Sequence, residues 1–281
     1  MSLVKTLSEL TLERMNTCTE SLAKKYLNSV KAIYGATENG KPEHIGSCVL
    51  IEHNGTKYLI TAAHVIDTNK HTSLYISGES KLVQITGQCL ITAAPNEDRN
   101  QDKLDFSILP IPDKISTEIG NVEYLSEREW HLDDLPNNER CCLVIGFPNS
   151  RNKRIDPAKN AVRQEPFVYA STIKSEVGLF SSTGGSPENH FLLNFCSKHS
   201  KDSSNKTINS IHPRGVSGGG LFLIEGMANP QNYQLDAECK GKLIGILIAF
   251  HKNQKVLMFT KLSLIILALT SPSSGRRTGA A

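Results

Sequence analysis

Short apolar segments alternate with clusters of glycine, asparagine, aspartate and proline over most of the chain. Between residues 29 and 111 these segments are VKAIYGA, GSCVLIEH, TKYLITAA, SLYISG, KLVQITGQCLIT and DFSILPI. Runs of this length, rich in strand-forming residues and bounded by turn residues, predict β-strands. The Asn-Gly pair of HNGT, at 53–56, predicts a tight hairpin between two of them.

A second series of apolar segments follows the polar stretch REWHLDDLPNNER at 128–140. Its members are CCLVIGF, PFVYASTIK, HFLLNF, GLFLIE, KLIGILIAF and KVLMFT. Two such series are typical of β-barrels or sandwiches. We therefore predict an all-β fold with helical additions, in which β-rich domains at 29–127 and 141–270 are joined by a linker at 128–140.

The two ends of the chain have different patterns. Apolar residues recur at roughly helical spacing over 3–28, which predicts one or two amphipathic helices in an N-terminal extension, 1–28. The apolar stripe of these helices needs a surface to cover it, so the extension is the candidate contact for a regulatory partner or for self-association. KLSLIILALT, 261–270, predicts a closing helix, and 271–281 predict a flexible tail.

Composition narrows the class of protein. Of the 281 residues 39% are apolar and 21% are charged, which is typical of a soluble globular protein. The net charge of +3 is dispersed, so nucleic acid is not the expected partner. The longest apolar stretch, 256–269, is interrupted by polar residues and is too short for a bilayer, and the N-terminus lacks the apolar core of a signal peptide. No membrane association and a cytoplasmic location are therefore expected.

The seven cysteines are an odd number, and two of them are adjacent. Their spacing suggests neither a disulfide framework nor a metal site, so no metal ion or cofactor is expected. Reduced thiols fit the cytosol best. We therefore predict that no disulfide joins any of Cys18, Cys48, Cys89, Cys141, Cys142, Cys196 and Cys239.

Glycines surround one serine in HPRGVSGGGLFLI, 212–224. They stand at 215, 218, 219 and 220, with Ser217 between them. Glycine weakens strands, so this cluster indicates either a tight turn or a place where the backbone approaches a ligand. A lone serine is a poor nucleophile, so the second interpretation requires a base and a group that orients it.

His64 and Asp105 are the candidates for these two roles. His64 follows the apolar strand of YLITAAHVI, although a core histidine bonded to the backbone would produce the same pattern. Asp105 directly precedes an apolar strand, where a carboxylate is costly unless it is paired, although a turn residue is the simpler alternative. Asp102 is a competitor, but it lies in a polar loop and needs no partner. The remaining histidines have polar surroundings typical of surface loops: His44, His53, His71, His131, His190, His199, His212 and His251.

TAAHV, LDFSIL and GVSGG occur once each and in this order, which resembles the chymotrypsin/trypsin superfamily of serine peptidases (the PA clan). The resemblance implies two six-stranded β-barrels with the active site between them. It also implies that Ser217 is the nucleophile, His64 the general base and Asp105 the group that orients the imidazole. The N–H groups of Gly215 and Ser217 would form the oxyanion hole.

The chain departs from the digestive members of that family at several positions. Val216 stands where those members carry the aspartate that pairs with a newly cut N-terminus, so activation by that route is not expected. Gly220 replaces the usual proline, and no cysteine follows His64. These features resemble intracellular or bacterial members. Control is expected instead from polar loops that could orient the Gly215 peptide, at 149–165, 178–189 and 198–210.

The segment GILIAF, 245–250, resembles the strand that flanks the substrate pocket in this family, which places Ile248, Ala249 and Phe250 beside substrate. Phe250 falls where many relatives have glycine and would narrow the pocket. Ile211 lies near the position of the acidic pocket floor of trypsin-like members, so a preference for Arg or Lys is not indicated.

Three hypotheses for function remain open. The first is a serine endopeptidase that cleaves protein or peptide substrates. The second is a catalytically silent trypsin-like fold that acts as a regulated binding module. The third, an esterase of the α/β-hydrolase type, is disfavoured because GVSGG lacks the G-x-S-x-G spacing and the order of the three residues differs.

Overall fold

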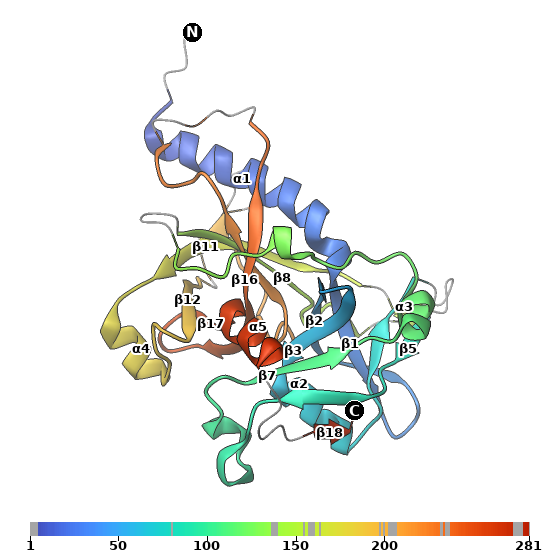
Figure 1. Cartoon of the computed structure of the whole chain (residues 1–281). Helices are drawn as coiled ribbons and strands as arrows, with labels where there is room; N and C mark the ends of the chain where they lie inside the picture. Colours follow the sequence, from blue (N-terminus) through green and yellow to red (C-terminus); the bar gives the residue numbers. More distant parts are fainter. Residues whose placement is uncertain are drawn as a thin grey trace.

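The computed structural model describes residues 5–79, 81–135, 140–153, 155–156, 161–162, 164–196, 198, 200–201, 207–230, 233, 237–271 and 278–280. Parts of three predicted segments lie outside these residues: 1–4 of the N-terminal extension, 136–139 of the linker, and 272–277 and 281 of the tail. The described chain is mostly β, with a long helix near its N-terminus (Figure 1).

The first half is one curved antiparallel sheet. Its order is β18-β6-β7-β3-β2-β1-β4-β5, and in the described residues the sheet is open rather than a closed ring of six strands. The strands are β1 (Val30–Ala36), β2 (Pro42–His53), β3 (Thr56–Ala62), β4 (Tyr75–Ser77), β5 (Leu82–Gln84), β6 (Gln88–Ile91), β7 (Phe106–Pro110) and β18 (Thr278–Ala280). The predicted segment KLVQITGQCLIT thus contains two strands, and three residues of the predicted flexible tail pair with β6.

The second half is a closed barrel with the order β11-β12-β17-β16-β15-β8, which confirms the predicted six strands. These are β8 (Cys141–Gly146), β11 (Phe167–Lys174), β12 (His190–Asn194), β15 (Gly220–Ile224), β16 (Gly241–His251) and β17 (Val256–Lys261). Two short pairs lie outside the barrel: β9 (Ile155–Asp156) with β10 (Ala161–Val162), and β13 (Ser200–Lys201) with β14 (Thr207–Ile208). A closed barrel beside a curved sheet is the chymotrypsin-like double-barrel architecture that the sequence predicts.

Short helices connect the strands and close the chain. They are α2 (Ala63–Asp67), α3 (Asp113–Ile119), α4 (Val177–Thr183) and α5 (Leu262–Thr270), with 3₁₀ turns at Leu27–Ser29, Thr68–Lys70, Pro95–Glu97, Arg99–Gln101 and Glu127–Glu129. The predicted closing helix is α5, which packs against β16 and β17. None of the described helices has the length and hydrophobicity needed to span a bilayer.

A single helix, α1 (Leu7–Tyr26), forms the described part of the N-terminal extension. A capping box between Thr6 and Glu9 starts it. Its buried residues recur every four positions, at Arg14, Cys18, Leu22 and Tyr26. The helix packs on β8 and β11 of the second barrel (Figure 1). The surface that covers the helix therefore belongs to the same chain, and the reason for expecting a partner there is removed.

Three contacts join α1 to the segment that leads into β16. The Arg14 guanidinium donates to the carbonyl of Ala237 at 2.7 Å. The Tyr26 hydroxyl donates to the carbonyl of Gly241 at 2.6 Å, and its ring stacks on Phe222 with centroids 4.5 Å apart. Between them, Cys18 forms a disulfide with Cys239.

The Cys18–Cys239 disulfide contradicts the prediction that every cysteine is reduced. The Cα atoms of the pair are 5.1 Å apart although 221 residues separate them in the sequence. Only the docking of α1 on the second barrel brings these positions together, so no local spacing could reveal the bond. The prediction of a cytoplasmic location loses the support that reduced thiols gave it.

Removal of this disulfide is expected to lower the free energy of unfolding by about 4 kcal/mol, because the bond closes a very long loop in the unfolded chain. The measurement is urea unfolding of the wild type and of the double variant Cys18→Ala/Cys239→Ala, each with and without reductant. The wild type should lose stability in reductant and the double variant should not respond. An unchanged wild-type midpoint would contradict the prediction.

Candidate active site

His64 and Asp105 come together because β3 and β7 are antiparallel neighbours. Ala62 at the end of β3 pairs with Phe106 at the start of β7. His64 lies two residues beyond that pair in the first turn of α2, and Asp105 lies one residue before it. The two side chains therefore meet at one end of the sheet.

The Asp105 carboxylate holds His64 at two points. Its Oδ2 lies 2.6 Å from His64 Nδ1, and its Oδ1 accepts the backbone N–H of His64 at 2.9 Å. A carboxylate only accepts, so Nδ1 carries a proton, and in the neutral form of the ring Nε2 has the lone pair. Asp105 is almost buried, whereas 38% of the His64 side chain is exposed. The imidazole is thus oriented from inside the protein and reachable from outside.

Asp105 has a left-handed backbone conformation, with φ at +42°. This region is uncommon for a residue with a Cβ atom and costs on the order of 1 kcal/mol. It persists because several contacts fix the surrounding loop. One of them is the carbonyl of Asp105 itself, which accepts the N–H of Ala63 at 3.0 Å.

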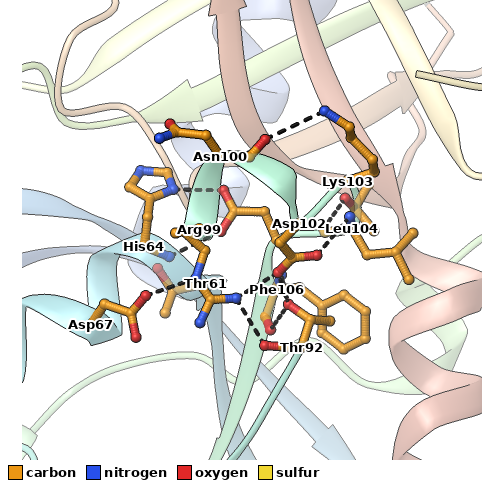
Figure 2. Close-up of polar contacts among 12 residues, drawn as sticks. Thr61, His64, Asp67, Thr92, Arg99, Asn100, Asp102, Lys103, Leu104 and Phe106 are labelled. Carbon is orange, nitrogen blue, oxygen red and sulfur yellow. Dashed lines mark hydrogen bonds and ion pairs between the residues drawn. The ribbon is translucent and has the colours of Figure 1, made fainter. Parts of the chain in front are cut away.

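An ion-pair network holds the loop ahead of Asp105 against the helix that carries His64 (Figure 2). Arg99 Nε donates to Asp67 of α2 at 2.7 Å, and its NH1 donates to Asp102 at 2.6 Å. Thr92 Oγ1 also donates to Asp102. Burial raises the pKa of Asp67, but the hydrogen bond and charge of Arg99 outweigh it and leave that pKa below its usual value. The prediction that Asp102 needs no partner is therefore wrong, because its carboxylate is buried and paired with Arg99.

The second barrel supports the same loop. His190 Nε2 donates to the carbonyl of Lys103 at 2.7 Å, and Thr260 Oγ1 donates to the carbonyl of Leu104. His190 and Thr260 are buried, so the prediction that His190 lies in a surface loop is wrong. Burial lowers the pKa of His190 despite its hydrogen bonds to backbone carbonyls. Both halves of the molecule thus position Asp105.

Ser217 lies in the turn before β15, which packs against the first sheet. Its carbonyl accepts the N–H of Ser47, on β2, at 2.7 Å. A Cβ atom on Gly46 would lie 2.6 Å from Val65 Cγ2 and 3.2 Å from that same carbonyl. The Ser217 backbone is therefore close to the residue that follows His64. Within the described residues, no hydrogen bond joins the Ser217 hydroxyl to the imidazole.

Two backbone N–H groups in this turn have no acceptor among the residues that the structure describes. Val216 N donates to Pro213 O at 3.0 Å, and Gly218 N donates to Leu247 O at 2.7 Å. The N–H groups of Gly215 and Ser217, which alternate with these along the chain, donate to nothing in the described part of the chain. These are the two groups that the sequence assigns to an oxyanion hole.

Glycine is required at 215 and at 218. Gly215 has φ at +90°, and a Cβ atom there would lie 2.7 Å from Asn149 N. Gly218 has φ at +84°, and a Cβ atom would lie 2.0 Å from the carbonyl oxygen of Ser47. The glycine cluster thus lets the turn approach the first sheet closely. This close approach explains why glycine occurs at these two positions.

The four predicted substrate-binding residues divide between two apolar clusters. Ile211 and Phe250 pack in the cluster inside the second barrel, where the Phe250 ring meets Phe195 and His212 edge-to-face. Ile248 is buried in the other cluster, and Ala249 packs against it. Ile211 and Phe250 therefore pack against the same apolar cluster, and Ile248 belongs to the other one.

His44 is a buried residue that the sequence assigns to the surface, and this prediction is wrong. Its ring meets Tyr34 edge-on, and its Cε1 would lie 2.9 Å from a Cβ atom on Gly215. Burial, with a smaller contribution from the charge of Lys153, lowers the pKa of His44 to about 4. A neutral imidazole therefore packs behind the turn that carries Ser217.

Acid is expected to destabilise the fold through His44. Its pKa is about 4 in the folded protein and about 6.5 in the unfolded chain, so between these values only the unfolded chain takes up the proton. Stability present above pH 6.5 is lost as the pH falls toward 4, by about 3 kcal/mol. The measurement is urea unfolding at pH 7.5 and pH 4 for the wild type and for His44→Gln, which should lose less. Equal losses in the two proteins would contradict the assignment to His44.

Several solved structures are similar to this chain. The Vibrio cholerae VesB protease is 12% identical with a TM-score of 0.51, over 88% of this chain and 64% of that chain. The serine protease domain of the Sesbania mosaic virus polyprotein is 13% identical (TM-score 0.42, 86% and 93% covered), and a Glu endopeptidase is 12% identical (TM-score 0.44, 86% and 88% covered). No protein-family model and no curated protein sequence matches the chain. The likeness to VesB shows the chymotrypsin-like fold.

Proposed function

We propose that this protein is a serine endopeptidase that hydrolyses peptide bonds in protein or peptide substrates. The observation that carries the proposal is the pairing of His64 with Asp105 beside a turn in which the N–H groups of Gly215 and Ser217 remain unused. A base with an open lone pair and two N–H donors without an acceptor in the described residues are the parts that acyl transfer needs.

In the proposed mechanism Ser217 Oγ attacks the substrate carbonyl carbon while His64 Nε2 accepts the serine proton. The imidazolium that forms is stabilised by Asp105, which stays ionised. The carbonyl oxygen gains negative charge and is bound by the N–H groups of Gly215 and Ser217, each contributing on the order of 3 kcal/mol in related enzymes. His64 then protonates the leaving amine, and water releases the acyl group by the same steps.

The first step of this mechanism requires the Ser217 hydroxyl to donate to His64 Nε2. That hydroxyl is not hydrogen-bonded to the imidazole in the described residues, and catalytic hydrogen bonds are often loose without substrate. The same observation favours the second candidate, a catalytically silent trypsin-like fold that acts as a regulated binding module. In that case the hydroxyl would never become activated.

Labelling with a fluorophosphonate probe distinguishes these candidates. An active endopeptidase forms a covalent adduct at Ser217, and mass spectrometry of the digested protein locates it. The same preparation should cleave peptides in a mixed-sequence library. A folded protein that gives neither the adduct nor cleavage would be the silent module.

We do not propose that a newly cut N-terminus activates this peptidase. Val216 is fully buried, and a Cβ atom on Gly146 would lie 2.6 Å from its Cγ1, so an apolar side chain fills the position before the nucleophile. A terminal ammonium would find no carboxylate there. Control through the loop at 149–165 is supported by Asn149, whose N–H donates to Arg214 O at 2.8 Å. Residues 154, 157–160 and 163 of that loop, and 199 and 202–206 of the third loop, lie outside the described residues.

A further inference from the structure

Ser47 is a buried residue of the first sheet that contacts the catalytic turn of the second barrel. Its backbone N–H donates to Ser217 O at 2.7 Å, and its carbonyl accepts the Thr61 hydroxyl at 2.7 Å. These two contacts come from the main chain and would exist for any residue at this position. The hydroxyl adds contacts that depend on serine.

The Ser47 hydroxyl has a single defined orientation. Its oxygen accepts the backbone N–H of Phe147 at 2.8 Å and lies 3.2 Å from the carbonyl oxygen of Gly215. The Phe147 N–H can only donate and the Gly215 carbonyl can only accept, so the hydroxyl proton points at Gly215. One side chain of the first half thus joins two segments of the second half.

Both peptide groups next to Gly215 are fixed by such contacts. In the preceding one, Arg214 O accepts the N–H of Asn149, which directs the Gly215 N–H the opposite way because the peptide is planar and trans. In the following one, Gly215 O accepts from Ser47 and Val216 N donates to Pro213. Glycine is the residue with the least intrinsic preference for one conformation, so these contacts decide where its N–H points.

We propose that the Ser47 side chain is a positioning residue for the oxyanion-binding N–H groups, an inference that rests on the proposed peptidase function. It touches neither substrate nor the reacting atoms. It restricts rotation of the Gly215–Val216 peptide, which links the peptide that carries the Gly215 N–H to the peptide that carries the Ser217 N–H, and thereby keeps both N–H groups directed at the developing oxyanion. Binding of the ground-state substrate does not depend on that direction to the same extent, because the full negative charge arises only during reaction.

The variant Ser47→Ala keeps the main-chain contacts and removes only the hydroxyl. Loss of a whole oxyanion donor costs about 100- to 1,000-fold in kcat in related enzymes, and a misdirected donor costs less. We expect kcat to fall by about 10- to 100-fold and KM to change by less than about threefold. The inhibition constant of a peptide boronic acid, whose tetrahedral adduct places an oxygen in the hole, should rise in parallel with the fall in kcat.

Ser77→Ala is the matched control. Ser77 is also buried in the first sheet, and its hydroxyl also reaches the second half of the chain, where it donates to Gln164 Oε1 at 3.1 Å. This variant loses a comparable hydrogen bond away from the turn at 213–219. It should keep kcat and boronic acid affinity within about twofold of the wild type.

A second pair of variants separates the hydroxyl from packing. Ser47→Thr and Ser47→Val have the same shape, and only the threonine retains a donor for Gly215 O. At equal urea midpoints the threonine variant should exceed the valine variant in kcat by about tenfold. Ser47→Ala with wild-type kcat, or with equal losses in substrate and boronic acid affinity, would overturn the positioning role. A wild type that neither labels with fluorophosphonate nor cleaves peptide would instead overturn the proposed function, and this inference with it.

Discussion

Replacing Ser217 with alanine is expected to abolish fluorophosphonate labelling and to lower kcat by about a millionfold, with the fold unchanged. The reaction needs the hydroxyl as the attacking atom, and no other nucleophile occupies the turn. The turn itself is held by main-chain contacts, among them Ser217 O with the N–H of Ser47 at 2.7 Å, and these do not involve the hydroxyl. The measurement is kcat on a fluorogenic peptide, with urea unfolding as the test of the fold.

Further variants test whether the loss of activity is specific to Ser217 and its general base. His64→Ala should lose nearly as much activity, and the double variant Ser217→Ala/His64→Ala should lose no more than either single one, because the groups act as a unit. Ser182→Ala, which changes an exposed serine of α4, should retain full labelling. An adduct that persists in Ser217→Ala would place the nucleophile elsewhere and contradict the proposed mechanism.

The elements that the sequence predicts well are those determined by local chemistry. The Asn-Gly pair at 54–55 forms the predicted hairpin turn between β2 and β3, with φ values of +49° and +73°. The glycines at 215 and 218 have the positive φ values that only glycine adopts easily. In each case the residue type alone indicates the backbone conformation, because few other residues adopt it easily.

The features that the sequence does not predict depend on contacts between distant segments. Cys18 meets Cys239 only because α1 packs on the second barrel. His44 and His190 stand in polar stretches, yet the packing of the two halves buries both. Asp102 has a partner three residues earlier, Arg99, but this pairing follows from the fold of the loop. Sequence spacing gives no signal for the disulfide or for the buried histidines, and it does not show the loop conformation that brings Arg99 to Asp102.

The candidate site combines both kinds of feature. The positions of His64 and Asp105 follow from strand ends and pairing, which the apolar pattern reveals. The left-handed conformation of Asp105 and its support from both halves do not follow from any short motif. Nothing in the sequence indicates a positioning role for Ser47, because a serine within a strand is common. The role of such a positioning residue depends on its hydrogen bonds to the turn, which exist only in the folded structure.

Asp105→Asn is expected to lower kcat by about ten-thousandfold while the protein remains folded. The carboxylate accepts from His64 twice, from the backbone N–H at 2.9 Å and from Nδ1 at 2.6 Å. The two bonds go to different carboxylate oxygens, and in the amide one of these positions is an NH₂ group that cannot accept. If the amide oxygen stays with the backbone N–H, the amide NH₂ faces Nδ1 and can bond only to a lone pair there.

The imidazole of the variant must then carry its proton on Nε2, the atom that should take the proton of Ser217. The opposite orientation of the amide would place its NH₂ against the backbone N–H of His64, two donors in contact, and is disfavoured by about 1–3 kcal/mol. Proton-detected NMR of the His64 ring nitrogens reports the tautomer directly, and kcat between pH 6 and 10 reports its consequence. Asp102→Asn is the comparison, because that carboxylate pairs with Arg99 and not with the imidazole. It should lower the urea midpoint yet retain an Nδ1-protonated His64 and most of kcat. If Asp105→Asn instead keeps kcat within tenfold of the wild type, Asp105 does not set the tautomer on which the proposed mechanism depends.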